Sequence, residues 1–237
     1  MYGNLGKVEN KGLDFSVDYV KRFNKDFDMS FKGTFTYAHN KVLEYDEPDF
    51  QKYPNISRVG HSIDQQLLYI ADRLFIDDAE VKRSPKQNIG GWVSGGDIKY
   101  LDQPDVNGNY DNVIDSNDRQ YTGMPTTPEI VYGFGPSFRY KKFDFSFFFQ
   151  GAARVSIMMN GIHPFGDGET RSVLQFIADD YWSEDNQNIY AKYPRLSKRD
   201  NPNNTAWSTY WQRNGAFLKL KNAEIGFNHK FFRIYLR

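Results

Sequence analysis

Strict alternation of apolar and polar residues is the feature that most constrains the fold of this chain. Four stretches alternate in this way along most of their length. Their apolar members are Leu13, Phe15, Val17 and Tyr19; Met29, Phe31, Phe35 and Tyr37; Ile130, Tyr132, Phe134, Phe138 and Tyr140; and Phe143, Phe145, Phe147 and Phe149. Side chains of a β-strand point alternately to its two faces, so each stretch predicts a strand with one apolar and one polar face.

A fifth stretch alternates less regularly, and a sixth begins near the last residues of the sequence. The fifth contains Phe217, Ala223, Ile225 and Phe227 as apolar members, but Lys219 and Lys221 interrupt it. Together the six stretches predict strands over residues 12–20, 28–40, 128–140, 143–152, 216–228 and 231–237. The chain is therefore expected to be all-β.

The connections between the predicted strands alternate between short and long. Residues 20–27, 141–142 and 228–230 form the short ones, whereas residues 38–129 and 151–216 form two very long ones. Structureless loops of such length are uncommon in compact domains. The alternation is typical of outer-membrane barrels, which have short periplasmic turns and long extracellular loops. A soluble β-sandwich would instead show a turn signal about every 8–12 residues.

Six strands are too few to close a pore, because single-chain outer-membrane barrels start at about eight strands. We therefore expect a partial antiparallel transmembrane β-barrel with open edges and two long extracellular loops. The strands that flank each short connection should pair as antiparallel hairpins.

Composition excludes several other classes of protein. The 30 basic and 30 acidic residues cancel, so the chain lacks the basic surface that nucleic-acid binding needs. The absence of cysteine excludes a disulfide scaffold, a cysteine-ligated metal and a thiol nucleophile. No apolar run approaches the roughly 20 residues of a membrane helix. No nucleophile elbow or paired catalytic carboxylates are recognisable, so we do not expect an enzyme.

Eight short segments carry further motifs in a fixed order. They are NLGKVENKGLDF at 4–15, GDIKY at 96–100, DSNDR at 115–119, TGMP at 122–125, PEIVYGF at 128–134, FDFSFFFQG at 143–151, YPR at 193–195 and FLKLKN at 217–222. In this order they resemble the late barrel strands and acidic loop of SusC/RagA-type TonB-dependent transporters. The resemblance covers nearly the whole chain.

That resemblance implies that residues 1–237 form the C-terminal part of such a barrel, without its plug domain and its last strand or strands. It implies a place in the outer membrane of a Gram-negative, Bacteroidetes-like bacterium. It also implies TonB-dependent uptake of oligosaccharides or peptides, with outer-membrane lipid, the TonB complex (through the plug) and a SusD-like surface lipoprotein as partners. The alternative is a soluble β-rich carbohydrate- or calcium-binding module, in which the apolar stripes would face each other instead of lipid.

Residues 107–118 fit the register of a calcium-binding EF-hand loop. Side-chain oxygens would come from Asn107, Asn109, Asp111, Asp115 and Asp118, and a backbone carbonyl from Val113. Calcium takes about six to eight oxygen ligands, and alternate donors can surround one ion. Two positions depart from the pattern, because Asn112 replaces the usual glycine and Asp118 replaces a longer glutamate. No cofactor is required, and calcium is the one candidate; the alternative is a solvated turn.

Aromatic residues gather in the second long connection. They are Trp182, Tyr190, Tyr193, Trp207, Tyr210 and Trp211. Such rings stack on sugars or clamp peptides, which predicts substrate binding, but they also pack loop cores or form interfacial girdles. In the same connection, residues 172–182 predict a short helix with Val173, Phe176, Ile177 and Tyr181 near one face.

Overall fold

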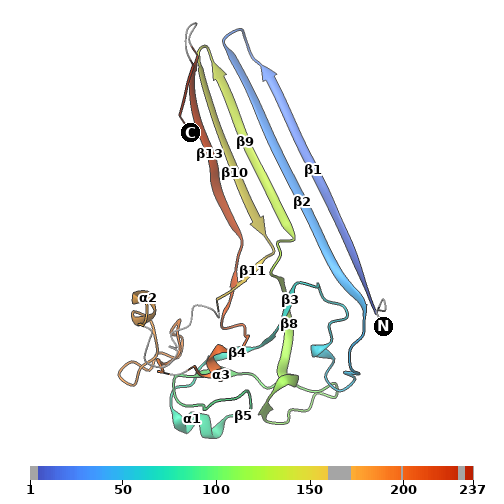
Figure 1. The fold of residues 1–237 in the computed structure, drawn as a ribbon, viewed down its shortest axis with the longest axis vertical. Helices are drawn as coiled ribbons and strands as arrows, with labels where there is room; N and C mark the ends of the chain where they lie inside the picture. Colours follow the sequence, from blue (N-terminus) through green and yellow to red (C-terminus); the bar gives the residue numbers. More distant parts are fainter. Residues whose placement is uncertain (1–4, 160–171, 199, 229–232, 237) are drawn as a thin grey trace.

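A six-stranded antiparallel sheet dominates the computed structural model, which describes residues 5–159, 172–198, 200–228 and 233–236 (Figure 1). Its strands are β1 (Gly6–Arg22), β2 (Phe27–Tyr45), β9 (Ile130–Tyr140), β10 (Phe143–Ala153), β13 (Phe217–Asn228) and β14 (Arg233–Leu236). They lie in the order β1-β2-β9-β10-β13-β14. Each strand therefore pairs with the strand of this same sheet that follows it along the chain. All six predicted strands are confirmed; residues 231, 232 and 237 of the last prediction lie outside the described part. The sheet stays open, with β1 and β14 at its edges.

The first two strands are longer than the alternation indicated. β1 begins at Gly6, opposite Tyr45 at the far end of β2. Several residues at this end of β1 are polar or small on both faces, so an apolar stripe cannot report the strand there. Backbone pairing alone extends the hairpin into this segment.

The strand register brings the apolar stripes onto a single face of the sheet. Phe15 lies opposite Phe35, and Phe35 lies opposite Tyr132 on the next strand. Further along, Phe134 pairs with Phe149, and their rings stack 5.5 Å apart. Residues directly opposite one another in a sheet project to the same side. The predicted division into an apolar and a polar face is therefore confirmed across these strands.

A β-bulge makes the predicted faces of the fifth stretch wrong in its first part. The register between β10 and β13 shifts between Phe148 and Phe149. On one side of the shift Ala223 lies opposite Phe147, as the stripe required, but beyond it Lys219 lies opposite Gln150 on the polar face. The predicted stripe is thus wrong from residue 217 to 221, because the bulge inserts one extra residue and reverses the alternation. The two interrupting lysines were the signal of this bulge.

The two long connections fold together at one end of the sheet, and the turns that join β1 to β2 and β9 to β10 lie at the other end (Figure 1). We call the first long connection (46–129) and the second (154–216) together the loop layer. Its strands are β3 (Gln65–Tyr69), β4 (Ala71–Leu74), β5 (Lys86–Gln87), β6 (Ile98–Tyr100), β7 (Val113–Ile114), β8 (Arg119–Pro125), β11 (Ser156–Met158) and β12 (Gln212–Asn214). They pair as β3-β8, β4-β6, β5-β7 and β11-β12.

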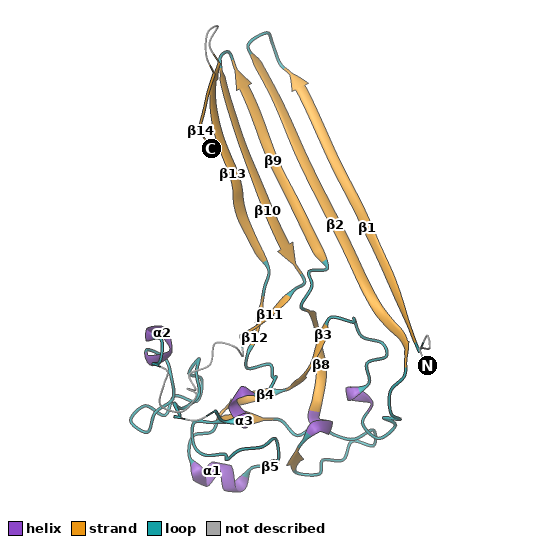
Figure 2. Cartoon of the chain, viewed as in Figure 1, coloured by secondary structure: helices purple, strands orange, loops and turns teal. Residues whose placement is uncertain are grey.

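Helices occur only in the loop layer among the described residues (Figure 2). They are α1 (Asp78–Arg83), α2 (Gln175–Ala178) and α3 (Pro202–Thr205), with 3-10 turns η1 (Pro54–Ile56) and η2 (Ser116–Asp118). None of these described helices is long and apolar enough to cross a membrane. The helix predicted over 172–182 shrinks to α2, and its predicted face is wrong in part: Ile177 is buried, whereas Val173 and Phe176 are exposed.

The hydrophobic core lies in the loop layer. Its buried members are Leu74, Ile98, Tyr100, Ile114, Ile177, Trp182, Ala191, Tyr193 and Trp211. They come from both long connections, so neither connection could form this core alone. Backbone hydrogen bonds join the connections as well: the Leu74 N–H donates to the Ile189 carbonyl at 2.9 Å, and the Tyr69 N–H donates to the Trp207 carbonyl at 3.0 Å.

Candidate functional site

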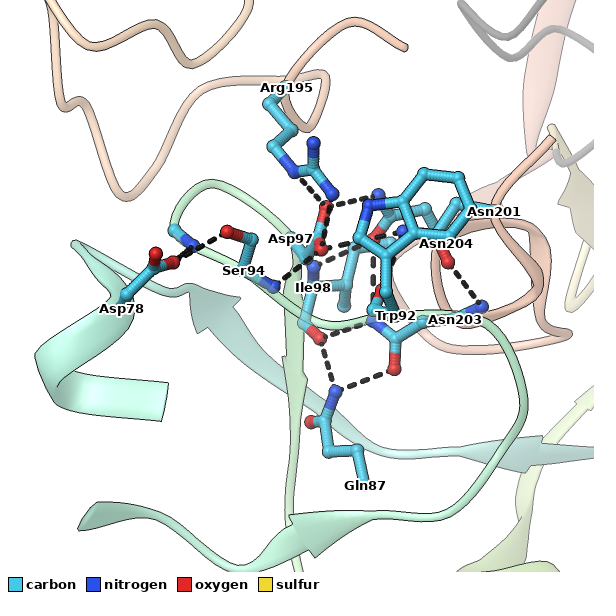
Figure 3. A network of polar contacts seen from close by, with 11 residues as sticks. Asp78, Gln87, Trp92, Ser94, Asp97, Ile98, Arg195, Asn201, Asn203 and Asn204 are labelled. Carbon is cyan, nitrogen blue, oxygen red and sulfur yellow. Dashed lines mark hydrogen bonds and ion pairs between the residues drawn. The ribbon is translucent and has the colours of Figure 1, made fainter. Parts of the chain in front are cut away.

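A buried carboxylate lies where the two long connections meet. Asp97 comes from the first connection and is 0% exposed. Arg195, from the second, donates from Nε to Oδ1 at 2.7 Å and from Nη2 to Oδ2 at 3.0 Å (Figure 3). Such a paired, bidentate geometry is the strong form of a charge-assisted hydrogen bond. The pair therefore fixes the two connections to each other.

Asparagines from the segment around α3 complete the surroundings of Asp97. The Asn204 Nδ2 donates to Oδ1 at 2.7 Å, and the Ser94 N–H donates to Oδ2 at 2.8 Å. The Asn203 Nδ2 donates to the Ile98 carbonyl at 3.0 Å, next to Asp97 in the chain (Figure 3). Burial raises the pKa of Asp97, while Arg195 and Asn204 oppose that rise by hydrogen bonding to the charged form.

A glycine lets Trp182 pack against this network. Gly96 has φ +80°, and a Cβ built there would lie 2.2 Å from Cε3 of Trp182. The Gly96 carbonyl also accepts the Arg195 N–H at 2.9 Å. Only glycine satisfies both the left-handed backbone and the close approach of the indole ring.

A second buried carboxylate joins the sheet to the loop layer. Glu129 immediately precedes β9, and its side chain is 4% exposed. Its Oε1 lies 2.6 Å from Nδ1 of His39 on β2, and its Oε2 accepts from Nε of Arg154 at 2.5 Å. Arg154, just after β10, has a positive φ of 50°. Three successive strands of the sheet are thus tied together at the rim where the loop layer begins.

The polar face of the sheet carries charges of its own near the short turns. A cavity of about 290 Å³ there is lined by Asp28, Arg139, Asp144 and Glu224, among others. Arg139 donates to Asp28, and Arg22 Nε donates to the same carboxylate at 2.9 Å. This face is therefore hydrophilic, in contrast to the apolar stripes on the opposite face.

The aromatic residues singled out in the sequence separate into two groups. Trp182, Tyr193 and Trp211 are buried in the core, and Trp211 is 1% exposed. Tyr210 packs against that core and donates from its hydroxyl to the Ala191 carbonyl at 2.8 Å. These four rings pack the loop layer, as the alternative interpretation held. Tyr190 and Trp207 are 77% and 47% exposed and remain available to a ligand.

The carboxylates of the predicted calcium loop accept hydrogen bonds from nearby backbone groups. Asp111 accepts the Val113 N–H at 2.9 Å, and Asp115 accepts the Asn117 N–H at 2.8 Å. Asp118 is buried and accepts from the backbone of Asp115 and of Gln103. Asn112 has a φ of 60°, the left-handed conformation that the position requires.

The remaining predicted ligands, Asn107 and Asn109, donate their backbone N–H groups to Asp105 at 2.8 and 3.0 Å. The Val113 carbonyl belongs to β7, which pairs with β5. Within the described part of the chain, no three acidic or histidine side chains gather in a way that could hold a metal. The geometry gives calcium binding no support, and it stays a prediction.

Sequence reasoning missed the residues around Asp97. Asp97 and Arg195 stand inside the GDIKY and YPR segments, but the motifs assigned them no partner. Asparagines are common in turns and are usually exposed there. Here, however, three of them are buried: Asn201, Asn203 and Asn204. A hydrogen-bonding role for a buried asparagine depends on contacts across about a hundred residues, which no local pattern reports.

No family model matches the chain. The TonB-dependent receptor P3 of Formosa agariphila is 26% identical over 231 residues, which are 95% of this chain and 22% of that protein. The TonB-dependent receptor SusC of Bacteroides thetaiotaomicron is 27% identical over 154 residues, covering 62% of this chain and 14% of SusC. The chain thus spans less than a quarter of the length of these relatives.

Solved structures share the fold. The RagAB peptide transporter superposes with a TM-score of 0.64 at 18% identity, covering 95% of this chain and 23% of that chain. The RagAB peptide importer in its closed-closed state gives a TM-score of 0.63 at the same identity. The open sheet and its loop layer therefore have the fold of one part of a larger barrel protein. The resemblance of this chain to SusC/RagA-type TonB-dependent receptors, which its motifs indicated, is confirmed over 95% of its length.

Proposed function

We propose that the chain forms a section of the wall and the extracellular loops of an outer-membrane nutrient importer. Energy would come from the inner membrane through TonB and a plug domain, and a SusD-like surface lipoprotein would cover the outer side. The relatives support this proposal because they are TonB-dependent receptors, SusC among them, and are 26% and 27% identical to this chain over the matched residues. The imported substrate would be an oligosaccharide or a peptide.

The observation that carries the proposal is the exposed apolar face of the sheet. Leu13, Phe15, Phe147 and Ile225 all lie on it and are between 41% and 61% exposed. An apolar surface of this extent marks an interaction site, and hydrocarbon is the partner that suits a tall, flat band of rings. The opposite face carries the charges of Asp28 and Arg139, as the lumen of a barrel does.

The soluble-module alternative requires a different arrangement of the stripes. In a β-sandwich, apolar faces pack against a second sheet and become buried. Here the core lies in the loop layer, and the apolar side chains of the sheet remain exposed. No specific observation favours that alternative.

The loop layer would face the exterior. Tyr190 and Trp207 are its exposed aromatic residues among those singled out for substrate binding, and they would contact substrate or the lipoprotein. Asp97 and Arg195 would hold the two connections as one rigid platform beneath those rings. No residue of the site is assigned a catalytic role.

The experiment that tests this proposal is reconstitution of the purified chain with and without lipid. We expect the chain to stay dispersed only with detergent and to float with liposomes in a density gradient. Sheet formation, followed by far-UV circular dichroism, should accompany flotation. A chain that is monodisperse without detergent and does not float would contradict the proposal.

A further inference from the structure

Aromatic residues form one continuous row across the sheet, at the end where the short turns lie. Phe27 on β2 lies opposite Tyr140 on β9, which in turn lies opposite Phe143 on β10. Phe143 then lies opposite Phe227 on β13, and Phe23, just after β1, stacks on Phe27 with ring centroids 5.1 Å apart. Directly opposed residues share a face, so the four strand members lie on the apolar face. We call these five residues the turn row.

Two lysines lie over rings of the turn row. Nζ of Lys21 lies 5.0 Å from the centroid of the Phe23 ring, and Nζ of Lys141 lies 5.4 Å from that of Tyr140. Both rings are about half exposed, at 49% and 52%. An ammonium is attracted to a ring face, and its apolar stem covers the ring beside it. Within the described residues, neither ammonium forms an ion pair with a carboxylate.

The two turns beside these lysines leave an excess of positive charge. They also carry Lys25 and Lys142, both exposed, whereas Asp26 is the one carboxylate of the two turns. The Lys141 N–H donates to the Asp26 carbonyl at 2.7 Å, so the turns are joined and their charges lie together. Asp28, on the polar face, is already bound by two arginines. A ligand that brings negative charge would therefore be attracted to the turn row.

Lysines at the other end of β1 have different partners. Nζ of Lys7 lies 4.0 Å from Oε1 of Glu44, and Nζ of Lys11 lies 2.8 Å from Oε2 of Glu9. Carboxylates of the chain itself thus compensate those two charges. At the turn row the partners of the ammonium groups are rings, which leave the positive charge uncompensated.

We propose that the turn row binds anionic phospholipid, with lipid phosphate at Lys21 and at Lys141 and acyl chains on the rings beside them. A phospholipid supplies both the anion and the hydrocarbon that this pattern needs, whereas an acidic protein segment supplies only the anion. Aromatic girdles lie at the membrane interface of barrels, and basic residues there attract anionic headgroups. The inference rests on the proposed function, which places the apolar face in lipid, and deepens it by naming the lipid class at the side opposite the loop layer.

The test measures the lipid selectivity of the full chain. Detergent micelles contain equal amounts of phosphatidylglycerol and phosphatidylcholine with the same acyl chains, and native mass spectrometry counts the lipids of each kind that stay bound. Lys21→Gln with Lys141→Gln removes both ammonium groups from the turn row. Lys7→Gln with Lys11→Gln is the matched control, because it makes the same change in charge where carboxylates are the partners. Lys21→Arg with Lys141→Arg keeps the charge.

We expect the native chain to retain phosphatidylglycerol about tenfold more than phosphatidylcholine, and the glutamine variant of the turn row to prefer it less than about twofold. The matched control and the arginine variant should stay within about twofold of the native preference, because both keep positive charge over the rings. An unchanged preference in the glutamine variant would overturn the inference, as would an equal loss in the matched control.

Glycerol phosphate, added at the same concentration as the lipid, separates the headgroup from the whole lipid. It should not displace phosphatidylglycerol, because it lacks the acyl chains that would cover the rings. Displacement would overturn the inference, since the lysines would then bind free phosphate. Flotation with liposomes of phosphatidylcholine alone tests the proposed function separately. A native chain that floats but shows no lipid preference overturns this inference alone, whereas one that does not float contradicts the proposed function on which it rests.

Discussion

The sheet and the loop layer bury their side chains in opposite ways. In the loop layer, Trp211, Tyr100 and Leu74 are almost completely buried, and an ion pair lies among buried asparagines. In the sheet, large apolar side chains such as Phe15 and Phe147 remain exposed on one face. The loop layer therefore contains its own core, as a small globular domain does. The sheet instead leaves one apolar face exposed, which lipid would cover in the proposed function.

This difference departs from the usual expectation that connecting segments run over the surface without a core of their own. Here the connections are long because they fold into a packed layer with short strands and helices of their own. Structureless loops of this length would be unusual, and the structure shows why these are not structureless. Conversely, the long strands are held by backbone hydrogen bonds to their neighbours, and their apolar side chains are left to whatever medium surrounds the sheet.

The largest expected effect is on the loop layer, through Arg195→Ala. The substitution leaves Asp97 buried without its cation, which typically destabilises by about 3–5 kcal/mol; we expect about 3 kcal/mol because Asn204 and Ser94 still donate. Near-UV circular dichroism of the loop-layer tryptophans during urea unfolding measures this loss. Lys192→Ala breaks an exposed pair with Asp180 and should cost under about 1 kcal/mol. Equal losses for both variants would show that the network does not hold the layer together.

The next effect concerns the sheet. Phe147→Arg places a charge on the apolar face and should cost about 2–4 kcal/mol of folding free energy in liposomes near mid-membrane. Ser146→Arg, one residue away on the polar face, should be mild. Urea titration of folded, liposome-embedded protein compares the two variants. If they lose the same free energy, the two faces do not experience different surroundings.

A smaller effect is the pH dependence of the loop layer. Burial raises the pKa of Asp118 to about 6, above the roughly 3.9 of an unfolded aspartate. The stability that this group contributes is therefore complete below about pH 4 and is lost as the pH rises through about 6, on the order of 1–3 kcal/mol. Thermal unfolding at pH 4.5 and 7.5 should show this slope in the native chain and a weaker slope in Asp118→Asn. A slope that the substitution leaves unchanged would assign the pH dependence to other groups.

The smallest expected effect is that of calcium on the loop at 107–118. Any affinity should be weak, about 10⁻⁴–10⁻³ M, because the carboxylates already accept backbone hydrogen bonds and Asp118 is short for its position. Calorimetric calcium titration of the native chain is compared with that of Asp111→Ala plus Asp115→Ala. Indistinguishable titrations would mean that the segment is only a hydrogen-bonded turn.

The sheet could be predicted from the sequence because its information is local. A period of two along each strand reports both the strand and its faces, and the short turns fix which strands pair. The prediction is wrong where the local pattern is not enough. The bulge opposite Phe148 reverses the faces of residues 217 to 221, and this bulge is defined only by the pairing of β13 with β10.

The loop layer could not be predicted in the same way. Its short strands are only a few residues long, and its buried polar residues find partners far away in the sequence, as Arg195 does with Asp97. The concentration of aromatic residues in the second connection did not indicate which rings would be buried, since Trp211 is buried and Trp207 is exposed.

The central claim is that the apolar face of the sheet contacts lipid and the polar face does not. Because the chain has no cysteine, single variants Phe147→Cys and Ser146→Cys each carry one fluorophore at a known place. In liposomes, we expect brominated lipid to quench the label at 147 strongly and the label at 146 weakly, with aqueous iodide giving the reverse order. Equal quenching by brominated lipid at the two positions would contradict the claim.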